Sequence, residues 1–128
     1  NFQDIFCNVN QNNICAICNS VVLSTLQIID SRKFLILMIQ RCTSDGLKIH
    51  TNFENYKSNQ VSISGKTFIT KAIIFHEGKT IRSGHYTVYL KNENGWTHCN
   101  DNVLTYKSRL PNKLTNSYLF FLERKMSK

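Results

Sequence analysis

A tight turn between two strand-like segments constrains the fold of this chain more than any other feature. Asn92-Glu93-Asn94-Gly95 ends in an Asn-Gly pair, which is a strong signal for the turn of a β-hairpin. Residues 86–90 before the turn and residues 96–99 after it have strand-like sequences. The sequence therefore predicts an antiparallel hairpin, and its far ends, at His85 and Asn100, are expected to lie side by side.

Short strand-like segments also make up most of the remaining chain. Residues 61–64 alternate between apolar and polar side chains, as a half-buried strand does. The continuous apolar run within residues 33–41 favours a buried strand over a helix. Further strands are predicted at residues 21–29, 68–76 and 117–124, residues 103–106 could form a strand or a helical turn, and the Asn-rich residues 1–20 are expected to be irregular. The pattern predicts mostly antiparallel β-structure with little helix.

The composition is that of one ordinary globular domain. Of the 128 residues, 41% are hydrophobic, which is enough for a core of modest size. The net charge is +8, but the basic residues are scattered and no segment interleaves them with aromatic side chains, which argues against nucleic-acid binding. No apolar run approaches the ~20 residues that cross a bilayer, and residues 1–4 do not begin a signal peptide.

The cysteine content bears on the cellular compartment. The chain has five cysteines, an odd number, and no secretory signal. This combination indicates free thiols or a metal site in a reducing environment rather than a disulfide framework. We therefore expect an intracellular protein of the cytoplasm or nucleus, with no membrane partner.

Four landmarks follow one another in the second half of the chain. They are a strand-like segment ending in His76-Glu77-Gly78, the tripeptide Gly84-His85-Tyr86, the segment from Trp96 to Asn100-Asp101, and the strand-like Ser117-Tyr118-Leu119-Phe120-Phe121. In this order and spacing they resemble the histidine box of ubiquitin-specific proteases. The resemblance covers about residues 15–124 and implies an α+β, mostly antiparallel β, papain-like cysteine protease fold.

The resemblance implies a role for each polar residue of this box. His85 would be the general base, Asn100 the third member of a catalytic triad, and Asp101 a polar support near the histidine or the oxyanion. A cysteine nucleophile needs a base that lowers its thiol pKa, and the base in turn needs an orienting partner. Gly84 has no Cβ atom, so the backbone of a substrate could pass close to it.

The other histidines and the tryptophan are assigned structural or surface positions. The family places a non-catalytic histidine at the position of His76. His50 and His98 are expected at the surface, and Trp96 is expected in the core.

A cysteine pair near the start of the chain extends the resemblance. Cys15-Ala16-Ile17-Cys18, followed by the apolar residues 34–39 and Arg41, resembles the second half of the zinc-bearing fingers of the family. The implied division of the C-terminal part of a catalytic domain, residues 1–128, is fingers in residues 1–30 and a palm sheet in residues 31–124, without the thumb.

Catalysis of this type requires no cofactor, and any zinc would be structural. Zinc takes four ligands, of which Cys15 and Cys18 supply two. Cys7 could be a third, although its spacing is not that of a zinc ribbon. Two free buried thiols are the alternative.

A convincing nucleophilic cysteine is missing from the resemblance. Asn13-Ile14-Cys15-Ala16-Ile17-Cys18-Asn19-Ser20 echoes the family's cysteine box, but the distance from Cys18 to Arg41 fits the fingers better. Cys99 is expected to pack within the hairpin. Two functions therefore remain. One is a deubiquitinase-type thiol protease acting after the C-terminal glycine of ubiquitin, incomplete in this chain, and the other is a catalytically inactive module that binds ubiquitin or serves as a scaffold.

Overall fold

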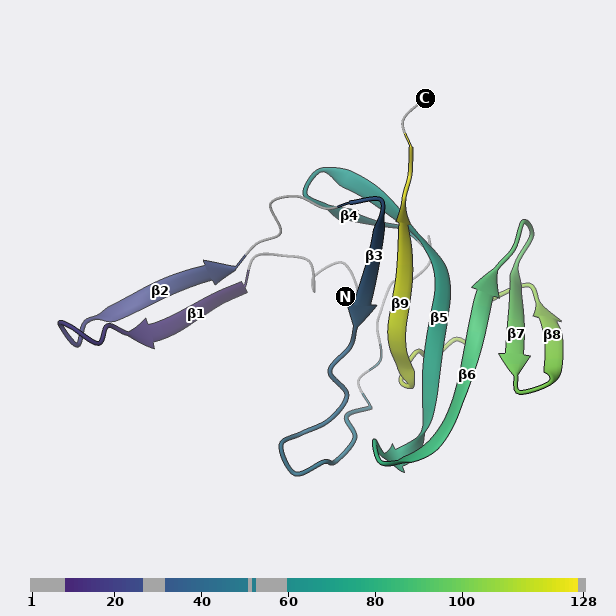
Figure 1. The fold of residues 1–128 in the computed structure, drawn as a ribbon, viewed down its shortest axis with the longest axis horizontal. Helices are drawn as coiled ribbons and strands as arrows, with labels where there is room; N and C mark the ends of the chain where they lie inside the picture. The colour runs from purple at the N-terminus through teal and green to yellow at the C-terminus, as the bar shows by residue number, and fades with distance from the viewer. Residues whose placement is uncertain (1–8, 27–31, 51, 53–59, 127–128) are drawn as a thin grey trace.

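The computed structural model describes residues 9–26, 32–50, 52 and 60–126, and these residues form two antiparallel sheets. The first is a separate ribbon of two strands, and the second has seven strands (Figure 1). The strands are β1 (Val9–Ile14), β2 (Val21–Leu26), β3 (Phe34–Met38), β4 (Gln60–Ile63), β5 (Lys66–Thr80), β6 (Ser83–Lys91), β7 (Trp96–Asn100), β8 (Val103–Lys107) and β9 (Ser117–Arg124).

The larger sheet runs in the order β3-β9-β5-β6-β7-β8, with β4 paired separately to β5. Every strand pair in it is antiparallel, so the mostly antiparallel prediction is confirmed. The last strand of the chain, β9, lies between β3 and β5 (Figure 1). The described residues form no helix, so the helical part of the α+β expectation finds no counterpart there, and no bilayer-spanning helix occurs among them.

The predicted hairpin is present. β6 and β7 pair with Tyr89 opposite His98 and Lys91 opposite Trp96, so the Asn-Gly turn lies at the tip. The amide of Asn92 donates to the carbonyl oxygen of Gly95 at 3.0 Å and closes this turn. Residues 103–106, left open between strand and helical turn, lie in β8, which extends the meander by one strand.

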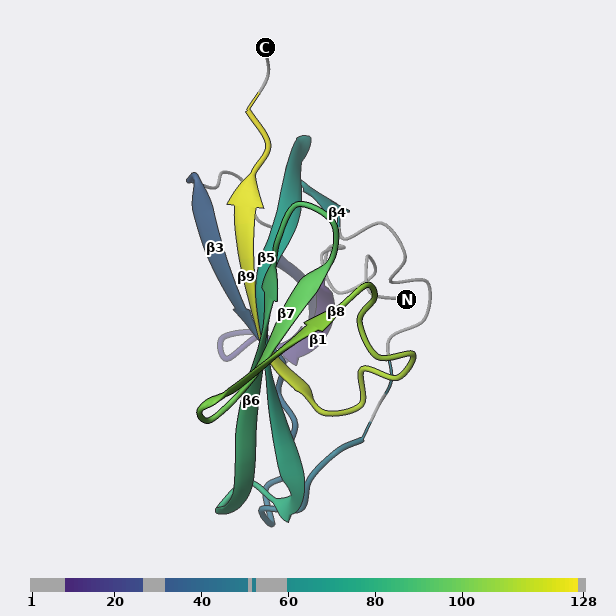
Figure 2. The same ribbon diagram turned by 90° about the vertical axis from the view of Figure 1, so that its right-hand side faces the viewer.

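One face of the larger sheet carries the core. Its central residues, Phe68, Phe120 and Ile73, are fully buried. Leu114 and Leu110, from the connection between β8 and β9, pack against this face, and Figure 2 shows that connection on one side of the sheet only. Among the described residues, the buried apolar side chains are Val61, Ile63, Phe68, Ile73, Phe75, Tyr89, Trp96, Leu114, Phe120 and Leu122.

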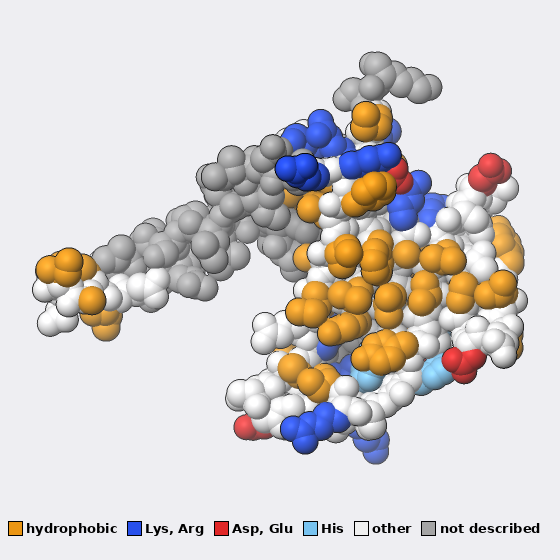
Figure 3. Space-filling model, viewed as in Figure 1, with side chains coloured by type: hydrophobic (Ala, Val, Ile, Leu, Met, Phe, Trp, Pro, Cys, Tyr) orange, Lys and Arg blue, Asp and Glu red, His pale blue; other side chains and the backbone are white. Residues whose placement is uncertain are grey.

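The opposite face of the sheet is apolar and exposed. Figure 3 shows hydrophobic side chains across the strands on the side that faces the viewer. Because successive side chains of β3 point to opposite faces of the sheet, Leu35 and Leu37 pack on the core while Ile36 is 65% exposed. This exposed apolar face comprises Phe34, Ile36, Met38, Tyr86, Leu90, Leu104 and Tyr106.

Two predictions about the first forty residues are wrong. The apolar run in residues 33–41 was expected to be a buried strand, but β3 is an edge strand whose second face is exposed. Residues 1–20 were expected to be irregular, yet Val9–Ile14 form β1, because pairing with β2 satisfies the backbone of this Asn-rich segment. The strand predicted at residues 21–29 is confirmed as β2 up to Leu26, and residues 27–29 lie outside the described part.

Arg41 joins three segments beneath the sheet. Its side chain is 3% exposed and donates to the carbonyl oxygens of Ser117 and Leu114, at 2.8 Å each. It also donates to the Ser117 hydroxyl at 2.9 Å, while the Ile49 amide donates back to the Arg41 carbonyl at 2.6 Å. The arginine therefore fastens the chain after β3 to the start of β9.

Candidate functional site

The structure brings His85 and Asn100 together. Nε2 of His85 lies 2.6 Å from Oδ1 of Asn100, within hydrogen-bond distance. The pairing of Val88 with Cys99, continued by one residue, sets Thr87 opposite Asn100. His85 is two residues from Thr87 and therefore projects from the same face, diagonally across from Asn100. The close approach follows from the register of the hairpin.

This contact fixes which nitrogen of the His85 ring is available for proton transfer. Because the Asn100 oxygen accepts, Nε2 of His85 carries the hydrogen. In the neutral ring, Nδ1 then keeps its lone pair and can accept a proton. Both side chains are exposed, so a reacting group could reach the imidazole from solvent.

Asp101 follows Asn100 in the chain and was expected to be a polar support near the histidine or the oxyanion. It lies in the turn between β7 and β8 with a φ of 52° and an exposed side chain. Within the described part of the chain, no hydrogen bond joins its carboxylate to His85. Asp101 is thus beside the pair in sequence, but it does not bond to the imidazole.

Gly84 is closely packed against other residues of the protein. From the sequence, its lack of a Cβ atom was expected to let the backbone of a substrate pass close to it. A Cβ atom at this position would lie 2.6 Å from Nε2 of His76 and 2.3 Å from the carbonyl oxygen of Glu77. The φ of 151° also disfavours any residue with a side chain. The protein itself therefore fills the space next to Gly84.

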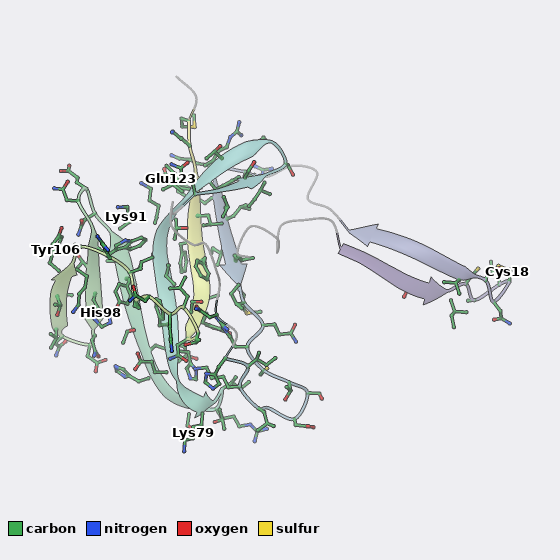
Figure 4. The ribbon with its side chains drawn as sticks, turned by 180° about the vertical axis from the view of Figure 1, so that it is seen from behind. Cys18, Lys79, Lys91, His98, Tyr106 and Glu123 are labelled. Carbon is green, nitrogen blue, oxygen red and sulfur yellow. The ribbon has the colours of Figure 1, made fainter. Side chains whose placement is uncertain are left out.

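His50, His76 and Trp96 lie in their expected environments, whereas His98 does not. His76 is 5% exposed and Trp96 is 3% exposed. His50 is exposed, as predicted. His98 was expected at the surface but is half-buried, because its ring stacks on Tyr89 with centroids 4.4 Å apart. Figure 4 shows His98 on the side of the sheet formed by β6, β7 and β8.

A cavity that the sequence did not reveal lies near the beginning of β6. Its volume is about 170 Å³, and its lining includes Met38, Arg41, Cys42, His76, Tyr86 and Tyr118. Tyr86 and Tyr118 pack with ring centroids 6.4 Å apart. The lining comes from segments that are far apart in the sequence, so only the sheet order could have located the cavity.

Lys48, like Arg41, holds separate segments together by hydrogen bonds, and the sequence did not predict this role. Its ammonium group donates to the carbonyl oxygen of His76 and, at 2.9 Å, to Oδ1 of Asn116. Burial and the neighbouring Arg41 lower the pKa of Lys48. A lysine in a polar loop carries no sequence signal of burial, so its role depends on the tertiary structure.

The cysteine pair lies at the tip of the separate ribbon. The Cys15 amide donates to the Ser20 carbonyl at 2.9 Å, and the Asn19 amide donates to the Cys15 carbonyl at 3.0 Å. Hydrogen bonds from Ser20 lower the pKa of the Cys18 thiol, which favours the thiolate that binds metals. Figure 4 places Cys18 at the far end of the ribbon, away from β6 and β7.

These two thiols do not complete a metal site by themselves. No group of three or more potential ligands gathers among the described residues, and Cys7 lies outside them. Four cysteines, Cys15, Cys18, Cys42 and Cys99, are free thiols in the described ranges. Cys99 pairs with Val88 and so projects from the face opposite to that of His85.

A family model described as ubiquitin carboxyl-terminal hydrolase matches residues 1–122. Ubiquitin carboxyl-terminal hydrolase 44 from Ailuropoda melanoleuca is 40% identical over 60 residues, which cover 42% of this chain and 8% of that protein.

Solved structures share the fold. The SAGA Ubp8/Sgf11/Sus1/Sgf73 DUB module bound to ubiquitin aldehyde matches 98% of this chain and 33% of that chain, with a TM-score of 0.54 and 21% identity. The crystal structure of an essential yeast splicing factor matches 82% of this chain and 27% of that chain, with a TM-score of 0.58 and 16% identity. The chain therefore spans a third or less of each of these structures.

Proposed function

Since the chain belongs to the ubiquitin carboxyl-terminal hydrolase family, we propose that it is the histidine-bearing part of a deubiquitinase. The reaction is hydrolysis of the peptide or isopeptide bond after the C-terminal glycine of ubiquitin, through an acyl-enzyme on a cysteine. The observation that carries this proposal is the 2.6 Å contact between His85 and Asn100. A solved neighbour of the same fold, bound to ubiquitin aldehyde, supports ubiquitin as the partner.

His85 acts as the general base in this proposal. Nδ1 takes the thiol proton, and the resulting thiolate attacks the carbonyl carbon of the terminal glycine. The same imidazole then protonates the leaving amine. Asn100 holds Nε2–H and so keeps Nδ1 facing the thiol. Asp101 supports the part of the site around His85 and Asn100 through its negative charge.

The thiol itself comes from outside the described residues in this proposal. Cys15 and Cys18 lie at the tip of the ribbon, and Cys99 projects from the other face. The palm-and-fingers division of a papain-like fold gives residues 1–30, which include the ribbon, the role of fingers and residues 31–124, which include the larger sheet, the role of palm. Cys15 and Cys18 would hold half of a structural zinc site, and no catalytic step passes through that metal.

The test joins this chain to a thiol-bearing N-terminal half taken from a member of the family. Hydrolysis of the C-terminal aminocoumarin amide of ubiquitin is measured for the joined protein, for His85→Ala and for the matched control His50→Ala. Loss of the base is expected to lower kcat/KM by about a thousandfold or more, because members of such a unit act together. Equal rates for His85→Ala and the unmodified protein would refute the assignment.

A second candidate is an inactive ubiquitin-binding or scaffold module. Two observations favour it: no cysteine of the described ranges is hydrogen-bonded to His85, and an essential splicing factor has the same fold. A ubiquitin probe with a thiol-reactive C-terminus separates the two candidates. Covalent labelling of the natural protein that contains this chain supports the enzyme, and reversible binding without labelling supports the module.

A further inference from the structure

His76 is enclosed on several sides at the start of the hairpin. Its side chain is 5% exposed, and its ring packs against Tyr86 with centroids 4.8 Å apart. On the other side, the ring lies where a Cβ atom of Gly84 would be, 2.6 Å from Nε2 and 3.0 Å from Cε1. The backbone of Ser83 also hydrogen-bonds this ring. The imidazole therefore touches Gly84 and Tyr86, which flank His85, and Ser83, which precedes Gly84.

The backbone of His76 is anchored as firmly as its ring. Its amide donates to the carbonyl oxygen of Asn116 at 2.9 Å, and its carbonyl oxygen accepts a hydrogen bond from the Lys48 ammonium group. Lys48 donates in turn to Oδ1 of the same asparagine at 2.9 Å. These bonds hold β5 against the connection before β9. The backbone from which the His76 ring projects therefore has a fixed position.

Gly84 transmits this fixed position to the next residue. A backbone at a φ of 151° is held by its surroundings, since the flat ring of His76 leaves room for hydrogen atoms only. The peptide after Gly84 carries the Cα atom of His85, whose imidazole must reach Asn100 across 2.6 Å. A change of a few tenths of an ångström at Gly84 would move the imidazole relative to its partner.

We propose that His76 is a positioning residue, which holds the Gly84–His85 peptide so that the His85 imidazole keeps its hydrogen bond to Asn100. The inference rests on the proposed role of His85 as base, and it adds a residue that acts on the base from the opposite side of the backbone. A flat ring of this size is the required feature, because it fits against both Gly84 and Tyr86.

The test uses the 128-residue chain itself and needs neither thiol nor ubiquitin. Long-range nitrogen–proton NMR spectra of ¹⁵N-labelled histidine report which ring nitrogen of His85 carries the hydrogen. Unmodified protein is expected to show the Nε2–H form. His76→Ala is expected to lower the ratio of Nε2–H to Nδ1–H by about fivefold, the net effect of one hydrogen bond. His76→Phe, which keeps a flat ring, is expected to stay within about twofold.

The controls separate positioning from simple support of the fold. His50→Ala removes an exposed imidazole and is expected to leave the His85 spectrum unchanged. The amide spectrum of β7 and β8 monitors folding, and His76→Leu replaces His76→Ala if the alanine variant does not fold. An unchanged His85 ratio in the folded alanine or leucine variant would overturn the proposal. Since this readout involves no hydrolysis, failure of the deubiquitinase proposal is recognised separately.

Discussion

Nε of Arg41 donates to the carbonyl oxygen of Ser117, 2.8 Å away, and so links the segment after β3 to the first residue of β9. The same guanidinium donates to the Leu114 carbonyl at 2.8 Å. Burial lowers the pKa of Arg41, but the group stays charged, and these carbonyl oxygens stand in for water around it.

Arg41→Met is expected to reduce the free energy of unfolding by about 3 kcal/mol, because it removes the guanidinium donor from the buried Ser117 carbonyl oxygen and one of the donors from the Leu114 carbonyl oxygen. Urea denaturation followed by tryptophan fluorescence measures the change. Arg82→Met, at an exposed position, serves as the matched control and is expected to change stability by less than about 0.5 kcal/mol. Equal losses in the two variants would contradict the anchoring role.

Thr87 offers a substitution that is expected to stabilise the protein. Its side chain is 3% exposed, and its hydroxyl oxygen has no hydrogen-bond partner among the described residues. Thr87→Val keeps the shape and removes a buried polar group, so we expect a gain of about 1 kcal/mol in the free energy of unfolding. Thr105→Val, at an exposed position on β8, is the comparison. A loss of stability in Thr87→Val would show that the hydroxyl is hydrogen-bonded in solution.

The pH dependence of stability reports on His76. Burial, followed by the charge of Lys48, lowers the pKa of His76 from its ordinary value of 6.5. The unfolded chain then binds a proton more readily than the folded one, so the contribution of this residue is complete above pH 6.5 and falls as the pH drops toward the folded pKa. Urea midpoints at about pH 7.5 and 5.5 should differ less for His76→Phe than for the unmodified protein. An equal difference between the two midpoints in both proteins would show that a group other than His76 causes the pH dependence.

The thiols are expected to differ in reactivity. Cys18 is exposed, and hydrogen bonds from Ser20, with a smaller one from Cys15, lower its pKa. Cys42 and Cys99 are half-buried. Alkylation with iodoacetamide at neutral pH, followed by peptide mass spectrometry, should modify Cys18 first, and Ser20→Ala should slow that reaction. A faster reaction at Cys99 would show that its strand opens more readily than the ribbon tip.

The exposed apolar face should make the isolated chain associate with itself. Ile36 and Leu104 are 65% and 69% exposed on that face. Replacing both with threonine is expected to lower the self-association seen by sedimentation velocity, while the urea midpoint changes little. Replacement of Ile17, which is 96% exposed on the ribbon tip, is the control. Association that depends only on the ribbon would contradict this expectation.

Local signals were sufficient to predict the hairpin and the last strand. The Asn94-Gly95 turn set the register that brings His85 to Asn100, and the apolar and aromatic run of residues 117–124 gave the bounds of β9. The exposure of β3 could not be predicted in this way, because periodicity does not say which neighbour covers a face. The close fit of His76 against Gly84 also depends on two strands meeting, and neither residue carries that information alone.

The placement of β9 between β3 and β5 has a consequence for synthesis on the ribosome. β3 and β5 each form hydrogen bonds with β9, and in the described part of the chain β9 is the strand to which β3 pairs. Translation produces Phe34 89 residues before its partner Glu123 (123 − 34 = 89). Nascent β3 therefore stays unpaired until the last strand leaves the exit tunnel, and a premature stop codon shortly before Ser117 would release a chain unable to close its sheet.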